Sequence, residues 1–367
     1  MSQIVVNKTN LNFLNIFNVC VSNTDSMANK INFFTKDGKL YLTQYSDSIN
    51  LVHIIKGNYD IDFNVWYETG FIFNFIKSVP DKMDIIFSEE DGIKLGNNSW
   101  YKPKTFQYDN RNFDLIQALI SDGNIKKYNL TDLDKIGKAK SFIGNPFTKD
   151  FDCIRADNGN FTTSYADDKV SVILKNNIKN LNESFFIDKT IYNVVKLMGL
   201  DEINISYLID KKYYMFAIEN EFFMFYPEKR YEIPNLNEDQ FKSLYFHSDI
   251  ICVDRKYLLE VLNRLNLITS KDYQNRIYFN LSKGSVEIEC KDGAEAKENI
   301  PASISDNLVG HTFILSSTFV QQILSVLIED KINIRASKEN TIAVSFTNSE
   351  NEEDIFIHCT YSNIPSV

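Results

Sequence analysis

The chain has 367 residues, 39 of them basic and 49 acidic, so its formal net charge is −10 at pH 7. With 44% hydrophobic and 24% charged residues it is too apolar to be disordered, and its length allows two or three domains. No stretch approaches the roughly 18 consecutive apolar residues of a membrane helix, and the first residues lack the order of a signal peptide, so we expect a cytoplasmic protein. The five cysteines are scattered without a CxxC pair, which argues against disulfides and zinc. Evenly spread, the negative charge would also repel nucleic acid.

The first third of the chain alternates helical and strand patterns. An opening helix is predicted over Leu11–Val21, and the turn Lys36-Asp37-Gly38-Lys39 predicts a tight hairpin before a strand over Lys39–Tyr45. A second helix with one buried stripe follows, marked by Phe71, Ile72, Phe75, Ile76 and Val79. The segment Asp81–Ile85 leads from this helix into further strands.

The middle third has the same order. An opening helix is predicted over Leu130–Ile143 with Asp132 as its N-cap, and Asp157-Asn158-Gly159-Asn160 predicts the hairpin. A second apolar stripe is formed by Ile191, Val194, Val195 and Met198. The segment Asp201–Ile205 then precedes Tyr213–Tyr226, which is rich in strand-forming residues.

The last third follows the order once more. Its opening helix is predicted over Asp254–Leu267 with Asp254 as the N-cap, and Ser282-Lys283-Gly284-Ser285 predicts a hairpin before the strand Ser285–Cys290. The second helix is marked by Phe319, Val320, Ile323, Leu324 and Leu327, and Asp330–Ile334 follows it.

These three thirds are internal repeats. The hairpin glycines are 121 and 125 residues apart, and the segments that begin at Asp81, Asp201 and Asp330 are 120 and 129 residues apart. Three matches in the same order indicate three tandem copies of one helix–strands–helix–strands unit. The sequence therefore predicts an α+β fold with three domains, over residues 1–122, 123–245 and 246–367.

No pattern of catalysis stands out. The chain lacks the GxxxxGK[ST], GxGxxG, HExxH and GxSxG motifs, and its four histidines lie far apart without metal-ligand spacing. The acidic run Glu350–Asp354 lacks the pattern of a calcium loop, and we expect it to be a solvated hairpin loop. We predict no catalytic residue, no bound metal and no cofactor.

The charges are distributed unevenly. The predicted helices carry ten basic residues against two acidic ones, and the count is still positive when the acidic residues that flank the helices are added. Lysine on solvated helix faces would explain the basic residues, but it predicts glutamate equally often, because glutamate is as good a helix former. We therefore predict a helical surface that faces a polyanion, formed by Lys8, Lys77, Lys135, Lys138, Lys140, Lys189, Lys196, Arg255, Lys256 and Arg264.

Over its whole length the chain resembles the bacterial-type DNA sliding clamp, the β subunit of DNA polymerase III. The resemblance rests on the order and spacing of the repeats and on several short segments. These are Asp37–Thr43, Val79-Pro80, Phe223–Pro234, Gly284–Ile288 and Ala294–Glu298.

The resemblance implies a ring of two head-to-tail copies, with helices lining the hole and antiparallel sheets outside. Residues around Trp100–Phe106 of one copy would contact residues around Leu267–Tyr273 of the other. Such a homodimer would encircle double-stranded DNA without reading its sequence, would tether the replicative polymerase, and would have no enzymatic activity. The alternative is an interaction or scaffold protein that keeps the clamp fold and no longer encircles DNA.

The resemblance also implies partner and DNA contacts outside the helices. Polymerase and clamp-loader peptides would bind an apolar pocket matched by Lys169, Val170, Val172, Pro234, Phe356, Ile357 and Cys359. The chain departs from the family pattern here, with Ala166–Val170 in place of Thr-Asp-Gly-His-Arg-Leu and a longer ending over Thr360–Val367. The loop Pro146–Asp150, with Phe147 and Lys149, matches a segment that touches DNA.

Overall fold

The structure is a computed structural model that describes residues 2–20, 29–46, 49–96, 99–106, 125–131, 133–142, 153–157, 159–165, 170–175, 184–228, 246–268, 275–291, 294–339 and 343–360. The chain folds into two compact units. The first unit is Met1–Thr131 with Thr190–Lys229, and the second is Asp132–Lys189 with Arg230–Val367. The second predicted domain contributes residues to both units, and the boundaries of the three domains stay predictions.

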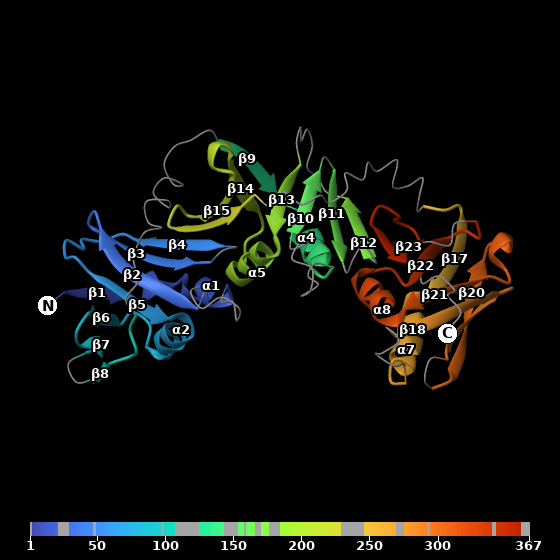
Figure 1. Ribbon diagram of the computed structural model, residues 1–367, viewed down its shortest axis with the longest axis horizontal. Coiled ribbons are helices and arrows are strands. Elements are labelled where there is room, and N and C mark those ends of the chain that lie inside the picture. Colours follow the sequence, from blue (N-terminus) through green and yellow to red (C-terminus); the bar gives the residue numbers. More distant parts are fainter. Residues whose placement is uncertain are drawn as a thin grey trace. The chain divides into compact units, whose positions relative to one another are not determined.

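The described helices and strands follow one order three times, as the sequence predicts (Figure 1). The first series is β1 (Gln3–Asn7), the 3-10 helix η1 (Lys8–Leu11), α1 (Leu14–Val19), β2 (Lys30–Lys36), β3 (Lys39–Tyr45), β4 (Asn50–Ile55), β5 (Asn64–Glu68), α2 (Thr69–Ser78), β6 (Asp84–Ser88), β7 (Gly92–Leu95) and β8 (Ser99–Tyr101).

The second series is β9 (Ile125–Leu130), α4 (Leu133–Lys140), β10 (Cys153–Asp157), β11 (Asn160–Tyr165), β12 (Val170–Lys175), β13 (Phe185–Asp188), α5 (Lys189–Met198), β14 (Ile203–Leu208), η2 (Ile209–Lys211), β15 (Tyr213–Ile218) and β16 (Phe222–Pro227). The third is β17 (Asp249–Asp254), α7 (Arg255–Leu265), β18 (Arg276–Ser282), β19 (Ser285–Cys290), β20 (Ala296–Ile304), η4 (Asp306–Leu308), β21 (Thr312–Ser316), α8 (Ser317–Val326), β22 (Lys331–Ala336), β23 (Ala343–Asn348) and β24 (Ile355–Cys359).

Local sequence explains most of these elements. The hairpin glycines Gly38, Gly159 and Gly284 have φ of +72°, +80° and +82°, the left-handed conformation that a tight turn needs. The side chain of Asp254 accepts a hydrogen bond from the backbone N–H of Tyr257 at 2.8 Å, so the predicted N-cap of α7 is confirmed. The predicted N-cap Asp132 lies outside the described residues.

Some predicted boundaries are wrong. The opening helices are shorter than predicted: α1 begins at Leu14 after a 3-10 turn, and α4 begins at Leu133 because residues 125–130 form the strand β9. The segment Tyr213–Tyr226 is a hairpin of β15 and β16 instead of one strand. Glu219 and Asn220 have positive φ at its turn. Neither residue is a glycine, so the turn could not be predicted as the three glycine hairpins were.

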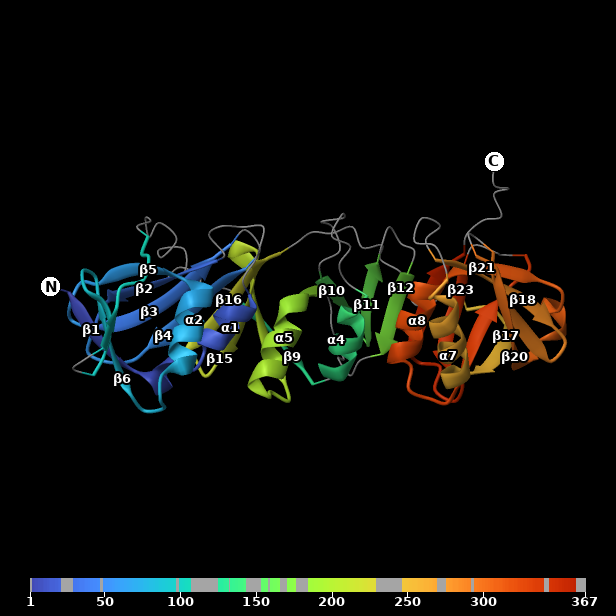
Figure 2. The same cartoon turned by 90° about the horizontal axis from the view of Figure 1, so that it is seen from below.

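All pairs among the described strands are antiparallel, so the α+β fold is confirmed. The first unit contains a four-stranded sheet, β1-β6-β7-β8, and an eight-stranded sheet, β5-β2-β3-β4-β16-β15-β14-β9. The second unit contains a twelve-stranded sheet, β13-β10-β11-β12-β24-β23-β22-β17-β20-β19-β18-β21. Helices α1 and α2 pack together, as do α7 and α8, and Figure 2 shows both pairs.

Two strand pairs join strands from different repeats. The β4–β16 seam lies in the first unit and pairs Asn50–His53 with Phe222–Phe225. The β12–β24 seam lies in the second unit and pairs Val170–Ile173 with Ile355–His358. Each seam therefore extends a block of four strands from one repeat with a block from the next.

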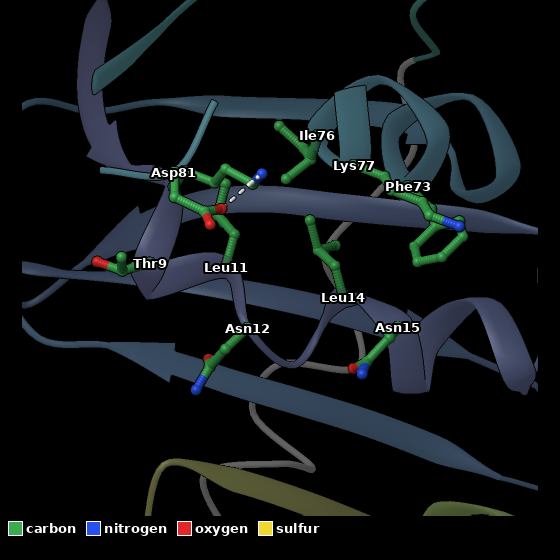
Figure 3. A pocket seen from close by; sticks show the side chains of 10 residues that line it. Thr9, Leu11, Asn12, Leu14, Asn15, Phe73, Ile76, Lys77 and Asp81 are labelled. Atoms are coloured by element: carbon green, nitrogen blue, oxygen red, sulfur yellow. Dashed lines mark ion pairs between the residues drawn. The ribbon is translucent and has the colours of Figure 1, made fainter. Parts of the chain in front are cut away.

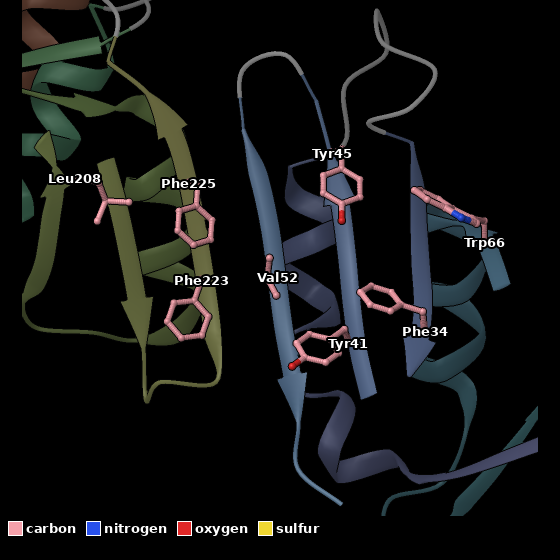
Figure 4. Close-up of a cluster of buried hydrophobic side chains, with 8 residues drawn as sticks. All are labelled: Phe34, Tyr41, Tyr45, Val52, Trp66, Leu208, Phe223 and Phe225. Atoms are coloured by element: carbon pink, nitrogen blue, oxygen red, sulfur yellow. The ribbon is translucent and has the colours of Figure 1, made fainter. Parts of the chain in front are cut away.

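The β4–β16 seam has an aromatic core on both faces of its sheet. One face carries a cluster of Phe34, Tyr41, Tyr45, Val52, Trp66, Leu208, Phe223 and Phe225, all buried (Figure 4). On the other face, the Phe13 ring of the α1 segment packs 4.8 Å from His53 and 5.4 Å from Phe222. Among the described residues, no helix is both long and apolar enough to cross a membrane.

Candidate functional site

The cation Lys8, predicted to face a polyanion, is bound within its own repeat. Its ammonium group donates to the Val79 carbonyl and forms an ion pair with Asp81 at 2.9 Å, and its side chain is only 18% exposed. Lys8 therefore ties η1 to the segment that follows α2.

The cations that open α7 play the same part in the third repeat. Arg255 donates from Nε to the Glu329 carbonyl at 2.8 Å and from Nη1 to the Leu324 carbonyl at 3.1 Å. Lys256 forms an ion pair with Asp330 at 2.9 Å, and this hydrogen bond lowers the pKa of the Asp330 carboxyl. The first and third repeats thus use a basic side chain near the opening helix to hold the segment after the second helix.

Arg264, near the end of α7, is held by β20. Its guanidinium donates from Nε and Nη2 to the two carboxylate oxygens of Glu298 at 2.9 and 2.7 Å. This bidentate hydrogen bond lowers the pKa of Glu298 and raises that of Arg264.

The α4 lysines meet the acidic run of the third repeat. Asp354 is 9% exposed and lies 3.4 Å from Lys135 and 3.7 Å from Lys138, and it also accepts the backbone N–H of Lys175 at 3.2 Å. Asp354 therefore connects α4, β12 and the start of β24.

The expectation of a solvated hairpin loop is confirmed for Glu350, Asn351 and Glu353, which are exposed between β23 and β24, and is wrong for Asp354, which is buried. Glu352 accepts two hydrogen bonds from Arg335 and one from Asn333. Glu329 accepts the backbone N–H of Glu350 at 2.8 Å and that of Asn351 at 3.1 Å, and these hydrogen bonds lower its pKa. The carboxylates of Glu352, Asp354 and Glu329 therefore hold the loop between β23 and β24.

Two of the predicted cations are exposed without an acidic partner among the described residues. These are Lys77 of α2, whose Nζ lies 6.0 Å from the centre of the Phe73 ring, and Lys196 of α5. Lys140 is half-buried, and the side chain of Lys189 is not described. Phe147 and Lys149 lie outside the described residues.

The residues predicted for a partner pocket lie on both faces of the β12–β24 seam. Val172 lies directly opposite Phe356, whose ring packs 5.5 Å from Phe142, just after α4. Ile357 lies on the other face, because side chains alternate along a strand. The side chains of Val170 and Cys359 are not described, and Lys169 and Pro234 lie outside the described residues.

The face of Ile357 carries an apolar cluster that the sequence did not identify. Ile173, Ala343 and Ile355 are buried with Ile357, and Phe246 packs against them. The Arg335 guanidinium lies 4.1 Å from the centre of the Phe246 ring. Side chains alternate between the two faces along β24, so residues could be assigned to a face once the strand was known. The mostly apolar sequences of β12 and β24 do not show which face carries a cluster.

The described histidine, cysteine and carboxylate side chains do not come together in a group of three that could hold a metal ion. His53 is buried among apolar side chains, and this burial lowers its pKa from 6.5 to about 4, while the nearby Glu221 carboxylate acts in the opposite direction. His53 is therefore a neutral core residue near pH 7.

Comparison with known proteins gives a clear result for the fold. No family model and no curated protein sequence matches the chain. Solved structures do match it over nearly the full length of both chains. A DNA polymerase sliding clamp from Pseudomonas aeruginosa has a TM-score of 0.77 and 13% identity, with 98% of this chain and 99% of that one covered.

Two further structures agree. The sliding clamp from Caulobacter crescentus has a TM-score of 0.78 and 9% identity, with coverage of 99% and 100%. The DNA polymerase III β subunit from Thermotoga maritima has a TM-score of 0.76 and 14% identity, with coverage of 98% and 99%. The chain therefore has the fold of the bacterial DNA sliding clamps over nearly its whole length.

Proposed function

We propose that the chain is a DNA sliding clamp, which encircles double-stranded DNA as a ring of two head-to-tail copies and tethers the replicative DNA polymerase. The observation that carries the proposal is the match in fold to three bacterial clamps at TM-scores of 0.76 to 0.78 over at least 98% of the chain. The proposal includes three domains with the predicted boundaries, no enzymatic activity and a cytoplasmic location.

The pairing of strand blocks supports a head-to-tail ring. At both seams, the strand at one edge of a four-stranded block pairs with the last strand of the next repeat. These pairs are β4 with β16 and β12 with β24. The corresponding strands that remain are β20 of the third repeat and β8 of the first. The same rule joins β20 of one copy to β8 of a second copy.

Both strands have an available edge among the described strands. β8 pairs only with β7. β20 pairs with β19 through Ala296–Pro301 on one side and with β17 through Ala302–Ile304 on the other, so Ala296–Pro301 keeps one side open. Unpaired edges invite another strand, and a ring would cover both.

Exposed apolar side chains accompany both edges. Trp100 and Tyr101 of β8 are 62% and 45% exposed. Leu267, just after α7, is 85% exposed, and α7 lies against β20 through Arg264 and Glu298. Apolar surface of this kind is typical of a protein interface.

The exposed cations suit sliding. A ring that moves along DNA needs weak attraction to phosphates and no contact with base edges. Lys77 and Lys196 are flexible point charges on helices, which serve this purpose better than a rigid arginine fork.

Short peptides of the polymerase and the clamp loader are the partners we propose at the β12–β24 seam. The apolar cluster of Ile173, Ala343, Ile355 and Ile357 supports this location. Phe246 at its margin offers a partly buried aromatic ring to an apolar peptide side chain, whereas the Arg335 guanidinium is already bound to Glu352.

The decisive experiment loads the protein onto nicked circular DNA with its clamp loader and measures retention by gel filtration. We expect retention until the circle is linearised, followed by rapid loss from the ends. Equal loss from circular and linear DNA would overturn the proposal.

Matched variants test the ring itself. Trp100→Glu places a charge on β8 and should weaken the dimer by at least about tenfold, because a buried carboxylate is costly. Ile61→Glu changes an equally apolar residue that is 48% exposed outside β8, and should leave the dimer intact. Sedimentation equilibrium measures both, and a monomeric wild-type protein at micromolar concentration would contradict the ring.

The alternative, a clamp-fold scaffold that does not encircle DNA, is favoured by one observation. Six of the ten predicted cations are bound to acids or carbonyls of their own chain, namely Lys8, Lys135, Lys138, Arg255, Lys256 and Arg264. The salt dependence of duplex binding separates the two functions, since its slope counts the phosphates contacted. Binding that is absent even at low salt would select the scaffold.

A further inference from the structure

A hollow of about 310 Å³ opens in the first repeat between η1 and α1 on one side and α2 on the other (Figure 3). The buried side chains of Leu14 and Ile76 give the hollow an apolar floor. The half-buried ring of Phe73 forms part of its wall. The side-chain amides of Asn12 and Asn15 also line it. A mostly apolar hollow with a few polar groups is typical of a small-molecule site, and the ring of Phe73 suits a planar group that can stack on it.

The hollow has a basic end at Lys77 and an acidic end at Asp81. Lys8 is occupied by Asp81 and the Val79 carbonyl, so it is not available to a ligand. Lys77 is exposed and stands beside Phe73, on the side of the hollow away from Asp81 (Figure 3). The Asp81 side chain is 88% exposed, so it offers an acceptor at its own end. A fitting ligand is planar, anionic near Lys77 and able to donate hydrogen bonds near Asp81.

We propose that this hollow takes an unpaired nucleobase of single-stranded DNA. The base lies against Phe73, its phosphate meets Lys77, and its exocyclic amino group points toward Asp81. Stacking of a base on an aromatic ring, combined with a nearby cation, is a general mode of single-strand recognition. A base in an intact duplex is paired and stacked, so duplex DNA does not enter.

The proposal deepens the proposed function, because it names a second class of nucleic acid for the same helical surface. A clamp with this site distinguishes the single-stranded template beside a primer end from the finished duplex. The asparagine amides supply further donors and acceptors for the base edge; the Asn15 oxygen already accepts the N–H of Ile16 at 2.9 Å, which leaves its NH₂ group to donate.

The experiment measures fluorescence anisotropy of a labelled single-stranded oligodeoxyadenylate of eight nucleotides, titrated with the full chain. Phe73→Leu keeps the apolar volume and removes the aromatic face, and Lys77→Gln removes the cation. Phe73→Leu should weaken binding by about tenfold, which lies within the range of roughly 1–3 kcal/mol for loss of one stacked base, and Lys77→Gln should weaken it severalfold through the lost phosphate attraction. Lys39→Gln removes an exposed lysine of the β2–β3 hairpin, outside the hollow, and should change binding by less than about twofold.

Thermal melting of each variant verifies that the fold is intact. Unchanged affinity in Phe73→Leu and Lys77→Gln overturns the proposal. So does equal weakening by all three substitutions, which indicates diffuse charge attraction. Binding of an apolar peptide in the hollow, with no binding of the oligonucleotide there, assigns it to a protein partner and also overturns the proposal.

Retention of the wild-type protein on circular duplex DNA, measured beside its oligonucleotide binding, separates this proposal from the proposed function. A wild-type protein that is retained on circles but does not bind the oligonucleotide through Phe73 contradicts only the hollow. A wild-type protein that binds the oligonucleotide through Phe73 but is lost from circles contradicts only the clamp.

Discussion

The β4–β16 and β12–β24 seams join strand blocks by the same antiparallel pairing, yet they bury different chemistry. The β4–β16 seam carries Phe223 and Phe225 in an aromatic cluster, with Phe222 on the other face. The β12–β24 seam carries Ile355 and Ile357 in a small aliphatic cluster. Backbone pairing therefore sets the geometry of a seam, and the side chains are free to differ.

Their polar groups differ as well. The β4–β16 seam buries the neutral His53 directly opposite Phe222. At the corresponding place of the other seam, Val172 lies opposite Phe356, and the polar anchor is instead the nearby Asp354. The comparison teaches that the first seam is closed by ring packing, whereas the second depends on the ion pairs of Asp354 at the start of β24.

Truncating one residue of the apolar cluster in each seam tests this difference most directly. Phe225→Ala should lower the free energy of unfolding by about 4 kcal/mol, and Ile357→Ala by about 3 kcal/mol, because each leaves a cavity in a packed cluster. Urea unfolding measures both. Ile328→Ala, at a side chain that is 71% exposed and has no part in either seam, should cost less than about 0.5 kcal/mol. A smaller loss for Phe225→Ala than for Ile357→Ala would contradict the larger contribution that we expect from the aromatic cluster.

Removing the anchor of the β12–β24 seam should have the next largest effect. Asp354→Ala leaves the Lys175 N–H and two partly buried ammonium groups without their acceptor, and should cost roughly 2 to 3 kcal/mol. Hydrogen exchange of the β24 amides should accelerate. Glu350→Ala in the same loop removes an exposed carboxylate and serves as the control. Equal effects of the two substitutions would show that Asp354 is not an anchor.

Acidification should weaken the β4–β16 seam in particular. The pKa of His53 is lowered by burial to about 4 from 6.5, so the unfolded chain binds this proton more readily. Stability from the neutral ring is complete above pH 6.5 and is lost as the pH falls toward 4, which amounts to about 2 kcal/mol between pH 7.5 and pH 5. His53→Leu should remove that part of the pH dependence in urea unfolding. An identical pH dependence in wild type and variant would disprove the role of His53.

The smallest effect is expected at an ion pair across the β4–β16 seam. Lys56 and Glu221 lie 3.0 Å apart, but the lysine side chain is 74% exposed. Solvent screens such a pair, so Lys56→Gln should cost no more than about 0.5 kcal/mol. A loss comparable to that of Asp354→Ala would mean that ion pairs matter equally in both seams.

Much of the fold could be predicted because each repeat contains the same recognisable turns and apolar helix patterns. Hairpin glycines at Gly38, Gly159 and Gly284 need positive φ, and the apolar stripes of α2 and α8 have helical spacing. The seams could not be predicted, since the paired strands of β4 and β16 lie far apart in sequence and their apolar runs carry no record of which partner they meet.

The candidate site was less predictable for the same reason. A count of charges along the helices cannot detect that Lys135 meets Asp354, 219 residues away. It also treats Arg255 as a surface cation, although the guanidinium binds two carbonyls of its own repeat. The sequence identifies which helical residues are basic, but the acidic and carbonyl partners of these residues are set by tertiary structure.

The available edges of β8 and β20 have a consequence for assembly. In the proposed ring they are unlike surfaces, so a contact between β8 of one copy and β20 of another would leave one edge open at either end. Two copies related by half a turn close the series, whereas a rotation that does not close lets it grow into a filament whose length rises with concentration. Substitutions that alter the angle between copies without weakening the contact are therefore expected to produce fibres instead of monomers.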